Sequence, residues 1–202
     1  PIPDSYTINV DGSIYSSNGT YNWLPSGVEL NDVKHVVIGN SVTSIGERSF
    51  LNCQSLTSII IPDSVTSIGK WAFRECTSLT SIDIPDSVTS IGESAFYNCK
   101  DLTSVTIPDN VTSIGKWAFQ NCSKLTSVII PNKVTSIGLW AFRECTSLKT
   151  VTIGNSVNSI GVSAFYYCTS LTSIDIPDSV TSIGKEAFIY CTSLTSVTFD
   201  QN

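Results

Sequence analysis

Seven cysteines and one histidine are the residues of this 202-residue chain with the greatest capacity for chemistry. Thiolates and imidazoles can bind metals, form disulfides or act as nucleophiles and bases. The cysteines recur at one fixed interval of 23 residues: Cys53, Cys76, Cys99, Cys122, Cys145, Cys168 and Cys191. Because zinc sites and disulfide frameworks show clustered, uneven spacings, an equal interval indicates an internal repeat instead.

Stacked repeats would place these cysteines in a straight ladder at the spacing of adjacent strands, roughly 4.8 Å. Parallel side chains at that spacing keep their Cβ atoms farther apart than a usual disulfide does. A straight ladder also lacks the converging ligands of a tetrahedral zinc site. We therefore expect buried free thiols that pack as small hydrophobic side chains, with no metal and no cofactor. Disulfide bonding or metal binding remains the alternative use of the ladder.

His35 is the only histidine, so a Ser–His–acid group could form only there. It aligns with Ser58 of the next repeat, which places it on the exposed face of a strand. The chain contains no G-x-S-x-G, phosphate-binding or dinucleotide-binding glycine motif. We expect a solvated surface histidine and no enzyme activity.

Aspartates that follow prolines form a second regular row, and carboxylates in a row could bind calcium. The row comprises Asp63, Asp86, Asp109 and Asp178. Asparagine stands at three of the seven equivalent places, which favours ordinary turn residues over a cation site.

The composition excludes several classes of protein. The chain is 41% hydrophobic and 14% charged, which is too apolar for intrinsic disorder. Its net charge is −6 and it has no basic cluster, which argues against nucleic acid and anionic lipid partners. No apolar run reaches the roughly 18 residues of a membrane-spanning helix, so we expect no membrane insertion.

The elements that must position these residues are the segments of one repeat. Ile59 and Ile61 lie two residues apart, which places both on the same face of a strand. Pro62 ends that strand, and a second short extended stretch leads to Gly69. Apolar residues over 72–79 lie three or four apart, which predicts one or two helical turns on the outer side. A single coil cannot bury its apolar side, so the coils must stack into a solenoid.

The chain divides into two parts on this basis. Residues 33–202 form the solenoid, with about seven full repeats and a terminal strand. Residues 1–32 break the repeat and are expected to cap it, with Asp11-Gly12 as a hairpin turn between Tyr6–Val10 and Ser13–Tyr15. No matching cap follows at the C-terminus, so we expect end-to-end self-association through the last strand as one way to cover it.

The repeated unit L-T-S-I-x-I-P-D-S-V-T-S-I-G-x-x-A-F-x-x-C resembles the BspA-like (Treponema-type) family of leucine-rich repeat proteins. The resemblance covers about residues 33–199, and its I-P-x-S-V-x-x-I-G and A-F-x-x-C blocks are distinctive together. It implies an α/β solenoid, namely a right-handed leucine-rich repeat with a parallel β-sheet on the inner face, a short second strand and short helical turns outside. It also implies a secreted or cell-surface adhesin and supplies no catalytic residues.

Two sets of variable positions are the candidate ligand-binding residues. One set faces solvent between the two inward aliphatic residues of each strand, where solenoids usually bind partners: Ile60, Asp83, Thr106, Ile129, Thr152 and Asp175. The other set is aromatic and lies on the outer side of the coils: Trp71, Trp117, Trp140, Tyr97 and Tyr166. Exposed aromatic side chains favour contacts with proteins or glycans. The alternative is that the rings pack against Lys70, Lys116 and Arg143 of the same surface.

These observations predict a non-catalytic protein-interaction module of a secreted or cell-surface protein. Its partners would be proteins or glycans on host or neighbouring cells. The alternative is a rigid structural spacer that presents another domain and has no ligand of its own, which the near-identity of the repeats favours.

Overall fold

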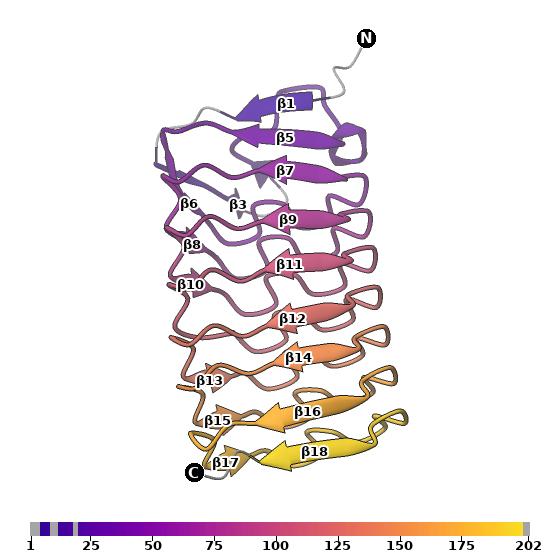
Figure 1. Ribbon diagram of the computed structural model, residues 1–202. Helices are drawn as coiled ribbons and strands as arrows, with labels where there is room; N and C mark the ends of the chain where they lie inside the picture. Colours follow the sequence, from indigo (N-terminus) through magenta and orange to yellow (C-terminus); the bar gives the residue numbers. More distant parts are fainter. Residues whose placement is uncertain (1–4, 9–11, 18–19, 200–202) are drawn as a thin grey trace.

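The structure is a computed structural model that describes residues 5–8, 12–17 and 20–199. Successive coils of the chain stack as a solenoid in which each coil contributes a strand, a second short strand and a return of turns (Figure 1). Two columns of parallel strands result. The solenoid and the parallel sheets that the sequence predicts are confirmed.

The first column holds the longer strands, whose exposed side we call the strand face. It comprises β1 (Ser5–Ile8), β5 (His35–Ile38), β7 (Ser58–Ile60), β9 (Ser81–Asp83), β11 (Ser104–Thr106), β12 (Ser127–Ile129), β14 (Thr150–Thr152), β16 (Ser173–Ile176) and β18 (Ser196–Phe199). The register between β5 and β7 joins His35 to Ser58 and Val36 to Ile59. One coil therefore equals one 23-residue repeat.

The second column holds shorter strands, as predicted. It comprises β2 (Gly12–Ile14), β6 (Val42–Ile45), β8 (Ser67–Ile68), β10 (Ser90–Ile91), β13 (Ser136–Ile137), β15 (Ser159–Ile160) and β17 (Ser182–Ile183). Single bridges through Ile114 join β10 to β13 in the same parallel sense. Each strand ends at an isoleucine, and in every strand except β17 that isoleucine is buried in the core.

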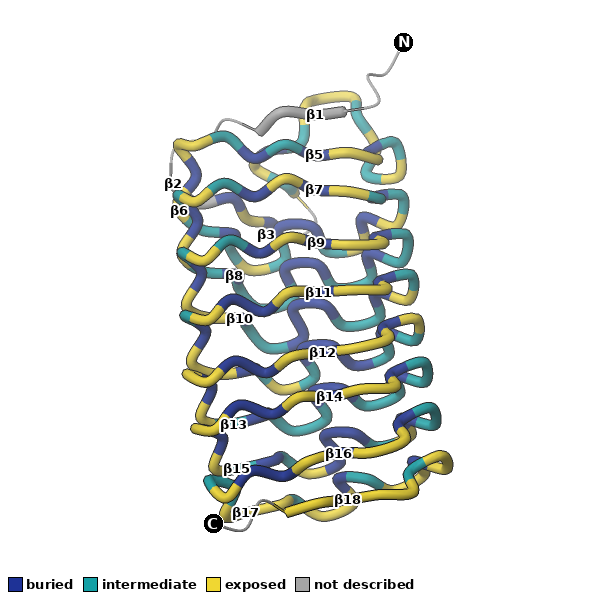
Figure 2. The backbone as a smooth tube through the Cα atoms, in the orientation of Figure 1, coloured by how far each residue is buried: buried dark blue, intermediate teal, exposed yellow. Residues whose placement is uncertain are grey.

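The core is a set of ladders in which identical side chains lie one above another. It runs the length of the stack, and each coil alternates buried segments with exposed ones (Figure 2). The clearest ladder joins seven phenylalanines from Phe50 to Phe188. Neighbouring rings are nearly parallel, with centroids 5.1 to 5.5 Å apart. Stacking therefore buries an apolar side that one coil alone would expose to water.

The glycine that follows each second strand is needed because adjacent coils approach closely there. A Cβ atom added at Gly138 would lie 2.7 Å from the carbonyl carbon of Gly115 in the preceding coil. Among the described glycines only Gly27 has a positive φ, so a left-handed backbone is not the reason for the repeated glycine.

The predicted helical turns of the outer segments, and with them the α/β class, are not confirmed for the described residues. The only described helix is η1 (Leu30–Asp32), a 3-10 turn. Each outer segment is a run of turns: 47–52, 70–75, 93–98, 116–121, 139–144, 162–167 and 185–190. Two residues in each run have a positive φ, for example Trp71 at 57° and Glu75 at 64°, and a left-handed residue interrupts a right-handed helix.

Hydrogen bonds between coils take the place of those within a helix. The N–H groups of Trp71, Phe73 and Glu75 donate to carbonyl oxygens of the next coil at 2.7 to 2.9 Å. Apolar residues three or four apart therefore face the core without forming a helix. The repeated outer surface is held by the neighbouring coil, which a pattern within one repeat does not reveal.

The N-terminal segment joins the stack in parallel. β1 pairs with β5 and β2 pairs with β6, so the described strands β1 and β2 do not pair with each other. The expected Asp11-Gly12 turn falls partly on residues 9–11, outside the described residues. A short antiparallel pair forms later, between β3 (Ser16–Ser17) and β4 (Thr20–Tyr21).

Trp23 covers the first ring of the phenylalanine ladder. Its ring lies 4.9 Å from that of Phe50, and its indole N–H donates to the carbonyl oxygen of Ser49 at 2.7 Å. At the other end, Ile183, Val197 and Phe199 are exposed because no described coil lies beyond them. End-to-end association stays a prediction.

Candidate functional site

The strand face carries the first predicted set in one column, with every member exposed. The members are Ile60, Asp83, Thr106, Ile129, Thr152 and Asp175. Ile60 lies beside Val37 of β5, and the two help to line an open pocket of about 610 Å³. Ile129 lies beside Thr152, and the hydroxyl of Thr198 donates to the carboxylate of Asp175. The two isoleucines stand three coils apart, so they do not form one apolar patch.

His35 also lies on the strand face, opposite Ser58 in the register. Its Nδ1 atom is 2.7 Å from the Ser58 hydroxyl and 3.3 Å from that of Thr57. Within the described part of the chain no carboxylate forms a hydrogen bond or ion pair with the ring. The pair therefore lacks the acid that orients the histidine of a catalytic triad.

All seven cysteines are buried and free, and they line the core beside the phenylalanines. The thiol of Cys76 donates to the carbonyl oxygen of Phe50 at 3.1 Å, and the same bond recurs in each later coil. Burial raises the pKa of the Cys53 thiol to about 12, because a thiolate would lose its hydration there. Neutral, hydrogen-bonded thiols of this kind are poor nucleophiles.

The second predicted set lies on the outer surface of the turn runs, which we call the turn face. Trp71, Trp117 and Trp140 occupy the second position of their runs, each with a φ near 56°, and are half-buried. Tyr97 and Tyr166 lie three positions further along and are also half-buried. The left-handed backbone turns each tryptophan across the outer surface of the coils. Such a conformation costs free energy for a large side chain.

Cations cover several of these rings. Arg48 and Lys70 each lie 4.4 Å from the Trp71 ring centre, and Lys70 also pairs with Glu93 of the next coil at 2.9 Å. Arg74 lies 4.4 Å from the Tyr97 ring.

Further along the turn face, Arg143 lies 5.2 Å from the Trp140 ring and 4.9 Å from the Tyr166 ring. Such contacts stabilise a surface by about 0.5–1 kcal/mol each. The alternative that the rings pack against cations of the same surface therefore has a physical basis at four of the five rings.

Trp117 differs from the other four. No cation lies over its ring among the described residues, and its partner is the tilted Trp140 ring at 5.6 Å. One broad aromatic surface therefore stays open to a ligand at this coil.

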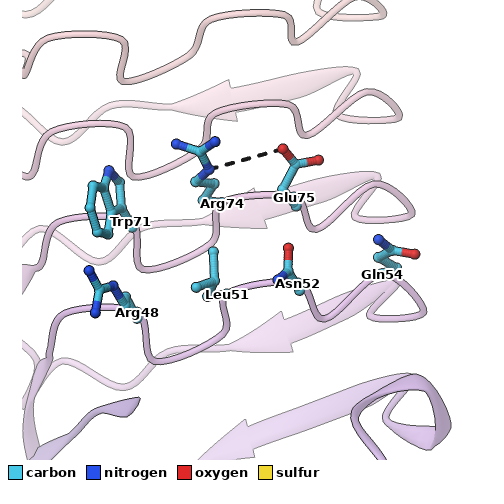
Figure 3. Close-up of a pocket in the computed structure, with 7 residues that line it drawn as sticks. All are labelled: Arg48, Leu51, Asn52, Gln54, Trp71, Arg74 and Glu75. Atoms are coloured by element: carbon cyan, nitrogen blue, oxygen red, sulfur yellow. Dashed lines mark ion pairs between the residues drawn. The ribbon is translucent and has the colours of Figure 1, made fainter. Parts of the chain in front are cut away.

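Two of the pockets on the turn face are lined by aromatic side chains. The larger, of about 600 Å³, lies between the first and second turn runs (Figure 3) and is lined by Arg48, Leu51, Asn52, Gln54, Trp71, Arg74 and Glu75. Its only ion pair joins Arg74 to Glu75 at 4.0 Å.

The second pocket, of about 270 Å³, is the one we call the Ser94 pocket. Ser94 takes the place at which the neighbouring coils carry Trp71 and Trp117, so a small residue leaves a gap between two large ones. The lining comprises Trp71, Arg74, Glu93, Ser94, Tyr97, Trp117, Gln120 and Trp140. Four of the five predicted aromatic residues thus meet at one place, and Tyr166 lies beyond it, beside Tyr190.

Sequence reasoning missed the polar part of this surface. Arg74 and Gln120 stand at the same repeat position as Tyr97 and Tyr166, and the column varies in every coil. That variation within an otherwise constant repeat was the available signal. Tyr167 and Tyr190, which are exposed and contact Tyr166, were missed as well.

Comparison with known proteins identifies one family. The family described as "BspA type Leucine rich repeat region (6 copies)" matches residues 29–132 and 112–202. A leucine-rich repeat protein of T. pallidum is 30% identical with a TM-score of 0.73, over 80% of this chain and 78% of the other. A leucine-rich repeat protein from Bacteroides ovatus is 24% identical with a TM-score of 0.60, over 96% and 69%. No curated protein matches the chain.

No helix within the described residues has both the length and the apolar character needed to cross a bilayer.

Proposed function

Because the chain belongs to the BspA-type leucine-rich repeat family, we propose that it is a non-catalytic module that binds macromolecules through its turn face. Leucine-rich repeat proteins generally serve as interaction or adhesion modules. The finer statement, that this chain mediates adhesion to host or neighbouring cells from a secreted or cell-surface position, is part of the proposal.

The observation that carries the proposal is the gathering of large aromatic side chains on one surface. Four aromatic rings line the Ser94 pocket, whereas the strand face offers two isolated isoleucines among small polar side chains. Buried aromatic anchors usually contribute most of the binding energy at an interface. The turn face is therefore favoured over the strand face as the binding surface.

The buried free thiols do not conflict with the proposed exported location. Free cysteines normally pair in oxidising compartments, but a thiol with a raised pKa and no access to solvent reacts slowly. The ladder is thus compatible with a secreted protein.

The test compares two pairs of variants that use residues already present at the same repeat positions. Trp117→Ser and Trp140→Ser copy Ser94 and Ser163, whose φ values of 53° and 51° match the site. Binding to immobilised extracellular-matrix proteins and to mucin should fall at least about tenfold in the double variant.

The matched control is Ile60→Thr with Ile129→Thr, which copies Thr106 and Thr152 on the strand face. This variant should bind as the original chain does. Loss of binding in the control pair alone would move the site to the strand face.

The rigid spacer is the second candidate function, and the cation–ring contacts favour it. Arg48, Lys70 and Arg143 occupy aromatic faces that a ligand would need. If the chain is a spacer, the double tryptophan variant should bind each tested surface as the original chain does, and only its stability should fall.

A further inference from the structure

Two polar side chains in the Ser94 pocket are buried without a partner. Gln120 is 9% exposed and Ser94 is 2% exposed. Within the described chain, neither the Gln120 side-chain amide nor the Ser94 hydroxyl makes a hydrogen bond, although both residues line the pocket. A buried polar group left without a hydrogen bond costs about 1–3 kcal/mol. Two such groups in one pocket indicate a site built to hydrogen-bond something else.

The other coils show that neither residue is needed by the fold. The place of Gln120 is taken by Leu51 and Ile189 elsewhere, and that of Ser94 by tryptophan in three coils. Apolar residues would fill these positions without an unpaired polar group. The solenoid itself therefore does not require a polar lining at this pocket.

We propose that the Ser94 pocket binds one hexose ring of a glycan, with the ring stacked on Trp117 and its hydroxyl groups bonded to Gln120 and Ser94. The proposal rests on the proposed function, because it names the partner of the same turn face.

The size of the pocket fits one sugar ring. Sites for drug-sized ligands span about 300–1,000 Å³, whereas this pocket measures about 270 Å³. The coils on either side of Ser94 place Phe73, Phe96 and Phe119 at successive spacings of 5.2 and 5.1 Å. The Trp71 and Trp117 coils are thus roughly 10 Å apart, so a ring midway between them lies about 5 Å from each coil.

The chemistry also favours a sugar over an aromatic peptide side chain. The Gln120 amide and the Ser94 hydroxyl each donate and accept, as does every sugar hydroxyl. A phenylalanine side chain stacked on Trp117 would leave both groups unpaired at the same cost as before, and a tyrosine side chain brings a single hydroxyl where a hexose brings several.

The charges at the pocket favour a neutral ring. Glu93 is paired with Lys70 at 2.9 Å, and Arg74 lies over Tyr97 and 4.0 Å from Glu75. No lining charge is left without an opposite charge nearby, so a ligand needs no net charge of its own.

The test titrates the protein with methyl glycosides of glucose, galactose, mannose and N-acetylglucosamine, and with N-acetyltyrosinamide as the peptide probe. We expect at least one glycoside to shift the NMR signal of the Trp117 indole N–H with a millimolar dissociation constant. Gln120→Leu should weaken that glycoside about tenfold while the melting temperature stays equal or rises. Ser94→Trp should abolish binding by filling the pocket.

The control is Gln54→Leu, an exposed amide of the neighbouring pocket, which should leave glycoside binding unchanged. The inference is overturned if no glycoside shifts the Trp117 signal, if only N-acetyltyrosinamide does, or if Gln120→Leu binds normally. The double tryptophan variant could lose macromolecule binding while Gln120→Leu binds the glycoside normally. That result would reject the sugar site but not the proposed function.

Discussion

The cysteine ladder predicts that the protein loses stability in mild alkali. Burial raises the pKa of Cys53 and Cys145 to about 12 from an ordinary value of 9.0, because a thiolate in the core would lose its hydration. The same cause raises the pKa of the other five thiols, those of Cys76, Cys99, Cys122, Cys168 and Cys191. The test raises the pH from about 8 to about 10 and follows the free energy of unfolding.

The direction follows from which state loses its protons first. Above pH 9 the unfolded chain ionises its cysteines while the folded chain keeps them protonated, so the unfolded state is favoured. The stability is present in full below about pH 9 and is lost progressively up to the folded pKa. At about pH 10 the Cys53 thiol and the Cys145 thiol each lower the free energy of unfolding by about 1.4 kcal/mol. Cys53 and Cys145 together account for about 3 kcal/mol, a large part of a typical domain's stability.

The assay is urea denaturation followed by circular dichroism at several pH values, with thiolate absorbance recorded on the same samples. Cys145→Ser is the matched control, because a serine hydroxyl can donate to Phe119 as the thiol does at 3.2 Å but does not ionise in this range. It should reduce the loss between the two pH values by about 1.4 kcal/mol. The reasoning is refuted if the free energy of unfolding does not change with pH, or if thiolate absorbance appears while the circular dichroism stays native.

Three further substitutions test the forces that hold the coils together, each by urea denaturation. Phe119→Ala should cost about 3–5 kcal/mol, because a fully buried ring is removed from the middle of the ladder. Gly138→Ala should cost about 1–3 kcal/mol, because the added Cβ would lie 2.7 Å from the backbone of Gly115. Asn121→Ala should cost about 1–2 kcal/mol, because residue 121 has a φ of 58° and its amide donates to Asn98 at 2.6 Å.

Each of the three has its own control. Phe119→Leu should cost less than alanine because it leaves a smaller cavity. Gly27→Ala meets no atom within 4 Å, so it tests positive φ without a clash and should cost less than Gly138→Ala. Asn121→Gly should cost less than alanine, since glycine adopts a positive φ freely. If a substitution and its control lower the free energy of unfolding equally, the reason given for that substitution is contradicted.

Much of the fold could be predicted because the repeat is strict. The alternation of Ile59 and Ile61 with exposed residues fixes which side of the strand faces the core. A constant step of 23 residues fixes the register, since any other step would break all the apolar ladders at once. The burial of the cysteines follows from the same step.

The outer segments could not be predicted in the same way. Residues 72–79 have the spacing of a helix, but the backbone at Trp71 and Glu75 is left-handed, and its N–H groups bond to the next coil. Those bonds exist only when a neighbouring coil is present, so no pattern within one repeat shows them.

The candidate site was half visible in the sequence. The aromatic residues stood out because they vary within a constant repeat. The place where they meet depends on Ser94, which nothing in the sequence singles out. In the fold, Ser94 lies between tryptophans of the coils on either side.

The coil length, the register and the identity of the core follow from the repeat alone, because any other register would expose the repeated apolar residues. The tertiary structure alone decided which outer side chains meet, because residues 23 apart become neighbours only when the coils stack. That is why Gln120 gives no sign of its role in the sequence and yet is the buried, unpaired amide of an aromatic pocket in the fold.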